Sequence, residues 1–304
     1  MRADPTTAEF WSSIDRDRFP GAVYWLGNPL VYHRYQVKAA GGRECNHWFE
    51  HVVARYLGGT EAANHVLTVG CGDGTLDRRF AEIGGFASLD GVDVAPGAID
   101  AARSEAARRG LDRLQYRVLD IEVDDPPSPP YDAIVFSSSL HHIQDLEGVL
   151  VRCSQALRVG GYLVVNEYVG PDRFVLPKNE VEAIRRAFLE IPERYRRSLW
   201  WENAGELLTE APLPDPEAVV REDPSEAIRS SEIREQVARI FEVLEDNAVG
   251  GTVLQFALHT IAGHFSQDDP GFLPVLERLF ELEDNLIATG EVSSHFRLIV
   301  GRRR

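Results

Sequence analysis

The sequence predicts an α/β fold, built on a mostly parallel sheet with helices on both faces. Short apolar runs alternate with helical patterns from about residue 64 to residue 166, as in parallel strands joined by right-handed crossovers. The stretch His65–Phe80 places a short apolar run before Gly-Cys-Gly-Asp-Gly and a helical pattern after it. In such a sheet we expect the ligand crevice at the carboxyl ends of the strands.

Composition limits the classes of protein to consider. The 304 residues suffice for one elaborated α/β domain, and a hydrophobic fraction of 44% with 26% charged residues is typical of a globular protein. A net charge of −16 argues against nucleic-acid or membrane partners. No signal core and no apolar run of spanning length is present. Cys45, Cys71 and Cys153 lack metal-ligand spacing and cannot all pair, which favours the cytoplasm and predicts no metal.

Residues 1–58 are interpreted as an aromatic cap followed by a leading helix. Residues 1–43 are rich in aromatic side chains, and Pro and Gly pairs interrupt them, so we expect an irregular segment. Residues 44–57 place Trp48, Val52 and Tyr56 at helical spacing before Gly58.

The glycine-rich stretch predicts a strand, a tight turn and a helix. Residues 66–69 suit a strand buried on both faces, and Thr75 is a good N-cap for a helix with Phe80 on its apolar face. Gly70, Gly72 and Gly74 leave main-chain N–H groups that a nucleoside-bearing ligand can approach closely. An ordinary glycine-rich turn is the alternative interpretation.

The alternation continues through residues 59–170, which we interpret as the core. Further strands are predicted at residues 87–94, 114–119, 131–137 and 162–166, and helices at 96–109 and 146–158.

The alternation breaks at residues 171–228, interpreted as a lid insertion over the crevice, with a helix at 179–189 and a loop at 212–224. Residues 229–304 complete the core. Helices are predicted from Ser230 to Arg239, after Gly251 through Ala262, and at 273–288, and strands at 241–244 and 295–300. The apolar run from residue 253 to 261 suits a core helix or a dimer interface, so a homodimer stays open.

Several motifs, in their order and spacing, resemble those of the class I S-adenosylmethionine (SAM)-dependent methyltransferases. They comprise Gly-x-Gly-x-Gly at 70–74, Asp93 ending the second strand, Asp120-Ile121 after the third, Tyr131–Val135 followed by Ser137 and Leu140-His141-His142-Ile143, and Leu157–Val165. The likeness covers roughly residues 60 to 170 and the final strands. It implies a Rossmann-like seven-stranded, mostly parallel sheet with the last strand antiparallel and a helical or irregular cap.

The resemblance also implies SAM as cofactor and S-adenosyl-L-homocysteine as product. Asp93 is placed to accept hydrogen bonds from the ribose hydroxyls, and Asp120-Ile121 to contact the adenine. The cofactor residues it implies are Gly70, Cys71, Gly72, Gly74, Asp93, Val94, Asp120, Ile121, Ser137 and His142. One departure is Thr68, where many relatives carry an acid; an acid from elsewhere in the chain could substitute.

The candidate catalytic residues are His142, Glu167, Tyr24 and His33. A histidine can act as a general base or orient the acceptor, and Glu167 ends a strand at the crevice rim. The candidate acceptor-binding residues are Tyr24, Trp25, Tyr32, Tyr35, His141, Glu167 and Tyr168. The alternatives are a packed or surface histidine, a salt bridge from Glu167 to a lid arginine, and hydrophobic packing of the aromatic segment.

These features predict methyl transfer to a small organic acceptor, aromatic or heteroaromatic, in bacterial natural-product biosynthesis. The fourth strand lacks the Asn/Asp-Pro-Pro-aromatic sequence of enzymes that methylate nucleic-acid amino groups. Methylation at carbon, nitrogen and oxygen all stay open. The rival interpretations are a methyltransferase acting on RNA or protein, and a catalytically silent SAM-binding protein.

Overall fold

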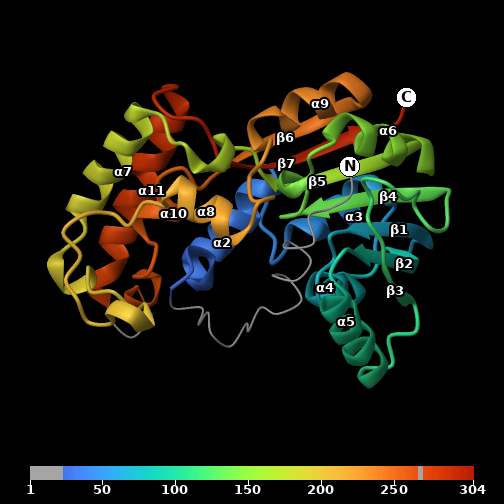
Figure 1. Ribbon diagram of the computed structural model, residues 1–304, viewed down its shortest axis with the longest axis horizontal. Coiled ribbons are helices and arrows are strands. Elements are labelled where there is room, and N and C mark those ends of the chain that lie inside the picture. Colours follow the sequence, from blue (N-terminus) through green and yellow to red (C-terminus); the bar gives the residue numbers. More distant parts are fainter. Residues whose placement is uncertain (1–22, 266–269) are drawn as a thin grey trace.

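A seven-stranded sheet runs through the computed structural model, which describes residues 23–265 and 270–304 (Figure 1). The strand order is β3-β2-β1-β4-β5-β7-β6. Strands β1 to β5 pair in parallel, and β7 runs antiparallel to both β5 and β6, which confirms the predicted sheet. The strands are β1 (Asn64–Val69), β2 (Phe86–Asp93), β3 (Leu114–Val118), β4 (Tyr131–Ser137), β5 (Leu157–Tyr168), β6 (Glu242–Gly250) and β7 (Phe296–Arg302).

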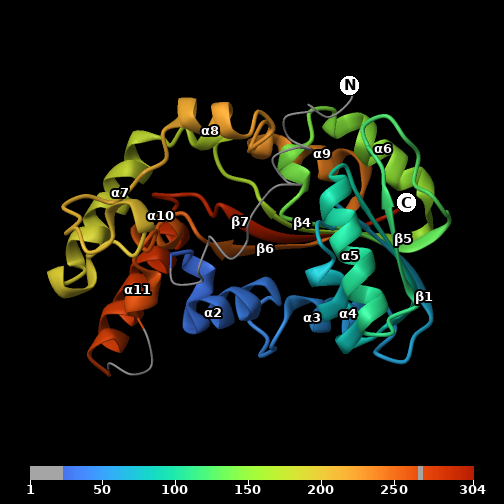
Figure 2. The same ribbon diagram turned by 60° about the horizontal axis from the view of Figure 1, so that its bottom comes forward.

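Both faces of the sheet are buried, because its central strands carry apolar side chains at successive positions. In β1, Val66 packs into one core cluster while Leu67 and Val69 pack into the other. Helices α3 (Trp48–Tyr56), α4 (Thr75–Ile83) and α5 (Pro96–Arg108) cover the first face. Helices α6 (Leu146–Ala156) and α9 (Ile233–Ile240) cover the second, as Figure 2 shows.

Helices α7 (Lys178–Glu190), α10 (Leu254–Ala257) and α11 (Leu273–Ala288) form a lobe beside the sheet, at the left of Figure 1. Helix α2 (Pro29–Ala39) packs against β6, and α8 (Pro216–Glu222) packs against residues 172–174. Helix α7 packs against α10 and α11, so the residues after β5 and the residues after β6 build this lobe together.

Four local predictions are wrong. Residues 29–39 form α2 rather than an irregular segment, because the Asn28 side chain accepts hydrogen bonds from the N–H groups of Leu30 and Val31, and Pro29 suits the first helical position. Within the predicted loop 212–224, Asp215 and Pro216 begin α8 in the same way. Gly74 rather than Thr75 is the N-cap of α4.

The apolar helix predicted to run through Ala262 ends at Ala257, and Thr260 further along takes a positive φ of 64°. Residues 1–22 of the predicted aromatic cap lie outside the described residues. Within the described ranges, none of the helices combines the length and the apolar character that a bilayer span needs.

Candidate functional site

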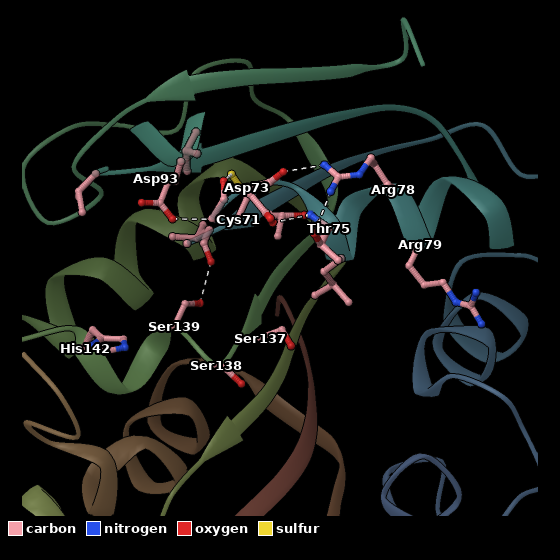
Figure 3. Close-up of a pocket in the computed structure, with 18 of the residues that line it drawn as sticks. Cys71, Asp73, Thr75, Arg78, Arg79, Asp93, Ser137, Ser138, Ser139 and His142 are labelled. Carbon is pink, nitrogen blue, oxygen red and sulfur yellow. Dashed lines mark hydrogen bonds between the residues drawn. The ribbon is translucent and has the colours of Figure 1, made fainter. Parts of the chain in front are cut away.

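A cavity of about 840 Å³ lies at the carboxyl ends of β1, β2 and β4, where the sequence predicts the crevice (Figure 3). Its volume is that of a typical small-molecule site. Residues of the predicted site that line it are Gly70, Cys71, Gly72, Asp93, Val94, Ile121, Ser137, His142 and Tyr32.

The glycine loop has a conformation and a packing that only glycine allows. Gly70, Gly72 and Gly74 have φ values of 69°, 54° and 72°, in the left-handed region. A Cβ at Gly70 would lie 2.3 Å from the Cβ of Ser139, and one at Gly74 would lie 2.5 Å from the Tyr116 hydroxyl. The loop backbone can therefore approach both its neighbours and a ligand closely.

Asp93 fixes this loop from the end of β2. Its Oδ2 accepts a hydrogen bond from the Gly72 N–H at 2.8 Å, and its Oδ1 accepts one from the Ala95 N–H at 2.9 Å. Figure 3 shows Asp93 and Cys71 on one side of the cavity, with Ser139 and His142 across from them. The carboxylate lies where it can also accept hydrogen bonds from a ligand.

Apolar side chains from β2 and the residues after β3 continue this wall. Val94, Leu119 and Ile121 line the cavity. Asp120 does not line it. Its Oδ1 instead accepts a hydrogen bond from the Glu122 N–H at 3.0 Å, which shapes the turn after β3.

Thr68, where the resemblance described above implies an acid, lies beside a buried carboxyl group from another element. Asp77 of α4 is fully buried, and its carboxylate oxygens, the Tyr116 hydroxyl and Thr68 Oγ1 make no hydrogen bonds within the described residues. Burial raises the pKa of Asp77 to about 7, and the nearby Thr68 hydroxyl opposes this shift. Thr68 lines the cavity, so the cluster of Asp77, Tyr116 and Thr68 extends to the cavity wall.

Glu167, at the end of β5, organises the loop that follows β4. It is fully buried, and its Oε2 accepts hydrogen bonds from the N–H groups of Ser139 and Leu140 at 2.8 and 2.7 Å. Its Oε1 accepts from the Tyr168 N–H at 2.9 Å and lies 2.5 Å from Nδ1 of His141. The side chain paired with Glu167 is thus His141. Within the described residues, the structure does not show the alternative of a salt bridge from Glu167 to a lid arginine.

His142 joins the cavity to residues 171–228, the segment interpreted from the sequence as a lid. It lines the cavity, and its Nδ1 lies 2.9 Å from Oγ of Ser225, which follows α8. Its neighbour His141 lies 3.5 Å from Glu226. Burial lowers the pKa of His141, but the carboxylates of Glu167 and Glu226 outweigh this effect and raise the pKa to about 9. Positive charge is therefore favoured between these carboxylates.

The structure does not bring the other predicted residues to the cavity. Trp25 and Tyr35 are buried against Phe296 in the core, where the Tyr35 hydroxyl lies 2.7 Å from Oδ1 of Asn166. His33 is exposed and pairs with Glu44 at 2.9 Å.

Tyr24 is about half exposed. The Tyr168 hydroxyl donates a hydrogen bond to the Pro171 carbonyl at 3.0 Å. Gly74, Tyr24, Tyr168, His141 and Glu167 are all absent from the cavity lining. Physically, tertiary packing rather than sequence position decides which aromatic side chains reach the crevice.

Several residues of the cavity wall were missed from the sequence, among them His47 and Arg78. His47 lines the cavity, and burial lowers its pKa to about 4, so its imidazole is neutral. Arg78 also lines it, and donates hydrogen bonds to the Asp73 carbonyl at 2.6 Å and to Thr75 Oγ1 at 2.8 Å. Arg78 follows the glycine loop closely in sequence, which was an available signal, whereas His47 had none.

Known proteins resemble this chain over its central part. A family model described as a methyltransferase domain matches residues 67–163. Aklanonic acid methyltransferase DauC of Streptomyces sp. (strain C5) is 35% identical over 136 residues, which are 43% of this chain and 61% of that protein. Demethylmenaquinone methyltransferase of Tropheryma whipplei (strain Twist) is 32% identical over 131 residues, which are 43% of this chain and 52% of that protein.

A solved structure extends the likeness of fold. Phosphoethanolamine N-methyltransferase 2 of Haemonchus contortus, in complex with SAM, matches with a TM-score of 0.53 at 15% identity, covering 90% of this chain and 57% of that one. The chain thus spans only about half to three fifths of the length of the curated relatives that it matches.

Proposed function

We propose that this chain, which belongs to the class I SAM-dependent methyltransferase family, transfers a methyl group from SAM to a small organic acceptor. The observation that carries the proposal is one cavity that extends from Asp93, at the end of β2, to His142, after β4. A nucleoside at the first position and an acceptor at the second would share one continuous cavity. Such an arrangement would hold the two reactants next to each other.

The residues present fit this cofactor. Asp93 supplies a carboxylate for ribose hydroxyls, the glycine loop lets a ligand approach its backbone closely, and Val94 and Ile121 offer an apolar surface to adenine. Thr68, on the cavity wall, has its buried hydroxyl beside the Asp77 carboxyl group. When bound, SAM supplies an electrophilic methyl group on a positively charged sulfur.

We assign the missing acid of the glycine motif to Asp77. Its carboxyl group lies beside the Thr68 hydroxyl, on the helix that follows the loop, so an acidic side chain is available close to the position where the family resemblance implies one. Asp77 does not line the cavity and would act through Thr68, which makes it a positioning residue.

We assign the acceptor side to the residues that follow β4. Ser137 and His142 line the cavity there, and Glu167 holds the intervening loop in place through two main-chain hydrogen bonds. Glu167 is buried, so it positions this loop and His141 rather than touching the acceptor. Tyr24 and His33, away from the cavity, receive no catalytic role in this proposal.

The names of the relatives support a small acceptor. Those proteins act on aklanonic acid and demethylmenaquinone by their names. We propose an acceptor of similar size, aromatic in character, in a biosynthetic pathway for a natural product. The support comes from the relatives and from Tyr32, since Trp25 and Tyr35 belong to the core. A cytoplasmic location accompanies the proposal, supported by the free thiols of Cys45, Cys71 and Cys153.

Calorimetric titration with SAM and with NAD tests the cofactor, and heat with NAD alone would contradict the proposal. Transfer of a labelled methyl group from SAM into a cell lysate, separated into small molecules and polymers, tests the acceptor. We expect label in the small-molecule fraction. Label in RNA or protein would instead favour a macromolecular acceptor. Tight SAM binding without transfer to any metabolite of its pathway would favour a silent SAM-binding protein.

A further inference from the structure

His141, His142 and Glu226 converge beside the cavity. Each offers one ligand atom, and within the described residues these atoms lie within 4.8 Å of one another. We propose that these three residues bind a divalent first-row transition-metal ion such as Zn²⁺. The sequence predicts no metal, because the cysteines lack ligand spacing. Glu226 lies far from the two histidines along the chain, and only folding brings the three together.

The separations suit a shared metal ion. Nε2 of His141 lies 3.5 Å from Oε1 of Glu226, and Nε2 of His142 lies 3.7 Å from Oε2 of the same carboxylate. Ligand atoms that each lie about 2.1 Å from one metal are roughly 3 to 4 Å apart in tetrahedral or octahedral geometry. Both histidine-to-Glu226 separations fall in this range, and side-chain rotation would bring the whole group, now within 4.8 Å, onto one ion.

A buried carboxylate orients the first imidazole. Glu167 Oε1 lies 2.5 Å from Nδ1 of His141, and Glu167 already accepts hydrogen bonds from three main-chain N–H groups. A carboxylate in that position accepts a hydrogen bond from Nδ1–H, and in the neutral imidazole this leaves the Nε2 lone pair directed towards Glu226. A carboxylate on the distal nitrogen is the usual outer partner of a metal-binding histidine.

A hydroxyl orients the second imidazole. Ser225 Oγ donates its one proton to Oδ1 of Asp223 at 2.7 Å, so at 2.9 Å from His142 it accepts a hydrogen bond from Nδ1–H. Nε2 of His142 is then the unprotonated nitrogen, and it faces Glu226. Both imidazoles thus present Nε2 to the carboxylate of Glu226.

Charge favours a cation at this point. The carboxylates of Glu167, Asp223 and Glu226 surround the two imidazoles, and Glu167 and Asp223 are almost wholly buried. Arg173 contributes one positive charge nearby, with its guanidinium on the Glu226 carbonyl at 2.8 Å. A divalent cation that binds Nε2 of His141 in place of a proton balances the remaining negative charge, and buried charges are stable only when balanced.

The donor set indicates the class of metal and of ligand. Two imidazoles and one carboxylate suit Zn²⁺, Co²⁺ or Fe²⁺ better than Mg²⁺ or Ca²⁺, which prefer oxygen ligands. Because His142 lines the cavity, a metal on three protein ligands presents its remaining coordination position there. An acceptor bearing a hydroxyl or carbonyl oxygen would occupy it, and this last step rests on the proposed function.

Metal titration of the full chain, untagged and stripped with a chelator, tests the site. We expect one equivalent of Zn²⁺ by calorimetry, and visible Co²⁺ bands typical of nitrogen and oxygen ligands. Glu226→Gln should weaken binding at least tenfold, and Ser225→Ala, which removes an outer partner, by a smaller factor. His264→Gln is the matched control, since it removes an imidazole that lies 2.7 Å from the Arg197 carbonyl, away from the site.

The proposal is overturned if the wild-type chain takes up no stoichiometric metal, or if Glu226→Gln binds it as tightly as His264→Gln. Thiolate bands in the Co²⁺ spectrum would also overturn it, because they would place the metal on a cysteine. Thermal melting verifies that each variant folds, and Ser225→Ala keeps the test valid if Glu226→Gln does not. SAM binding measured without metal is a separate result, so failure here leaves the proposed function standing.

Discussion

The main-chain N–H of Gly72 donates to Oδ2 of Asp93 at 2.8 Å, which joins the middle of the glycine loop to the end of β2. One carboxylate therefore shapes the loop and also faces the cavity. Loss of this side chain acts on loop order and on ligand contacts together.

Asp93→Ala is expected to weaken SAM binding by roughly 1.5–3 kcal/mol for each charge-assisted hydrogen bond lost, and to lower the melting temperature. Calorimetry and thermal melting measure the two effects. Asp112→Ala, at an exposed position, is the control. An unchanged affinity in Asp93→Ala would mean that the ribose binds elsewhere.

Gly70→Ala should destabilise the protein by about 1–3 kcal/mol and weaken SAM binding. Its added Cβ would lie 2.3 Å from the Cβ of Ser139, at a φ of 69°. Gly110→Ala, at a φ of 65° with open space around it, measures the backbone strain alone. Adding Ser139→Gly to Gly70→Ala should recover part of the stability in denaturant unfolding. No recovery would show that overlap with Ser139 is not the cause.

Glu167→Gln should lower turnover while sparing SAM affinity, and should cost about 1–3 kcal/mol of stability. Glutamine presents an N–H₂ group to a site where Glu167 accepts three main-chain N–H groups, so at least one donor loses its partner. Initial rates, calorimetry and unfolding separate these effects. Glu210→Gln, on the exposed part of the lid, is the control. Full turnover in Glu167→Gln would contradict the assignment of Glu167 as a positioning residue.

Asp77→Asn should change the pH dependence of stability. The pKa of Asp77 is raised from 3.8 to about 7 in the folded state, so the folded chain binds the proton more tightly than the unfolded chain does. The stability contributed by this group is therefore lost as the pH rises from about 4 to about 7.

The Asn variant lacks this loss, so near pH 4 its free energy of unfolding should not exceed that of the wild type for this reason. Above pH 7 the difference should reach an upper limit of about 4 kcal/mol in favour of the variant. Urea unfolding at several pH values measures it. An advantage that does not change with pH would contradict the raised pKa. If Asp77 supplies the charge that Thr68 lacks, the same variant should bind SAM more weakly.

The sequence was sufficient to predict the sheet and the nucleoside end of the cavity. Runs such as 131–137 are apolar on both faces, and an acid at the end of a strand lies at a known edge of a parallel sheet. Apolar runs and the residue that ends a strand are local features of the sequence, so they can be recognised without knowledge of the tertiary structure.

Long-range contacts could not be predicted in this way. Asp77 lies beside Thr68, and Glu226 beside the two histidines, only because α4 and the lid pack where they do. Helix α2 was missed because Asn28 and Pro29 were interpreted as a turn signal, although the same pair can begin a helix. Trp25 and Tyr35 were assigned to the acceptor from composition, which cannot distinguish a core aromatic from a cavity wall.

The position of β7 inside the sheet has a consequence for synthesis on the ribosome. Within residues 23–265 and 270–304, β6 pairs with β7 alone, and β7 separates it from β5. Until residues 296–302 leave the exit tunnel, nascent β6 has no partner strand, and one edge of β5 has no strand to pair with. The parallel half of the sheet can assemble while translation continues, whereas the other half must wait for its late-arriving middle strand.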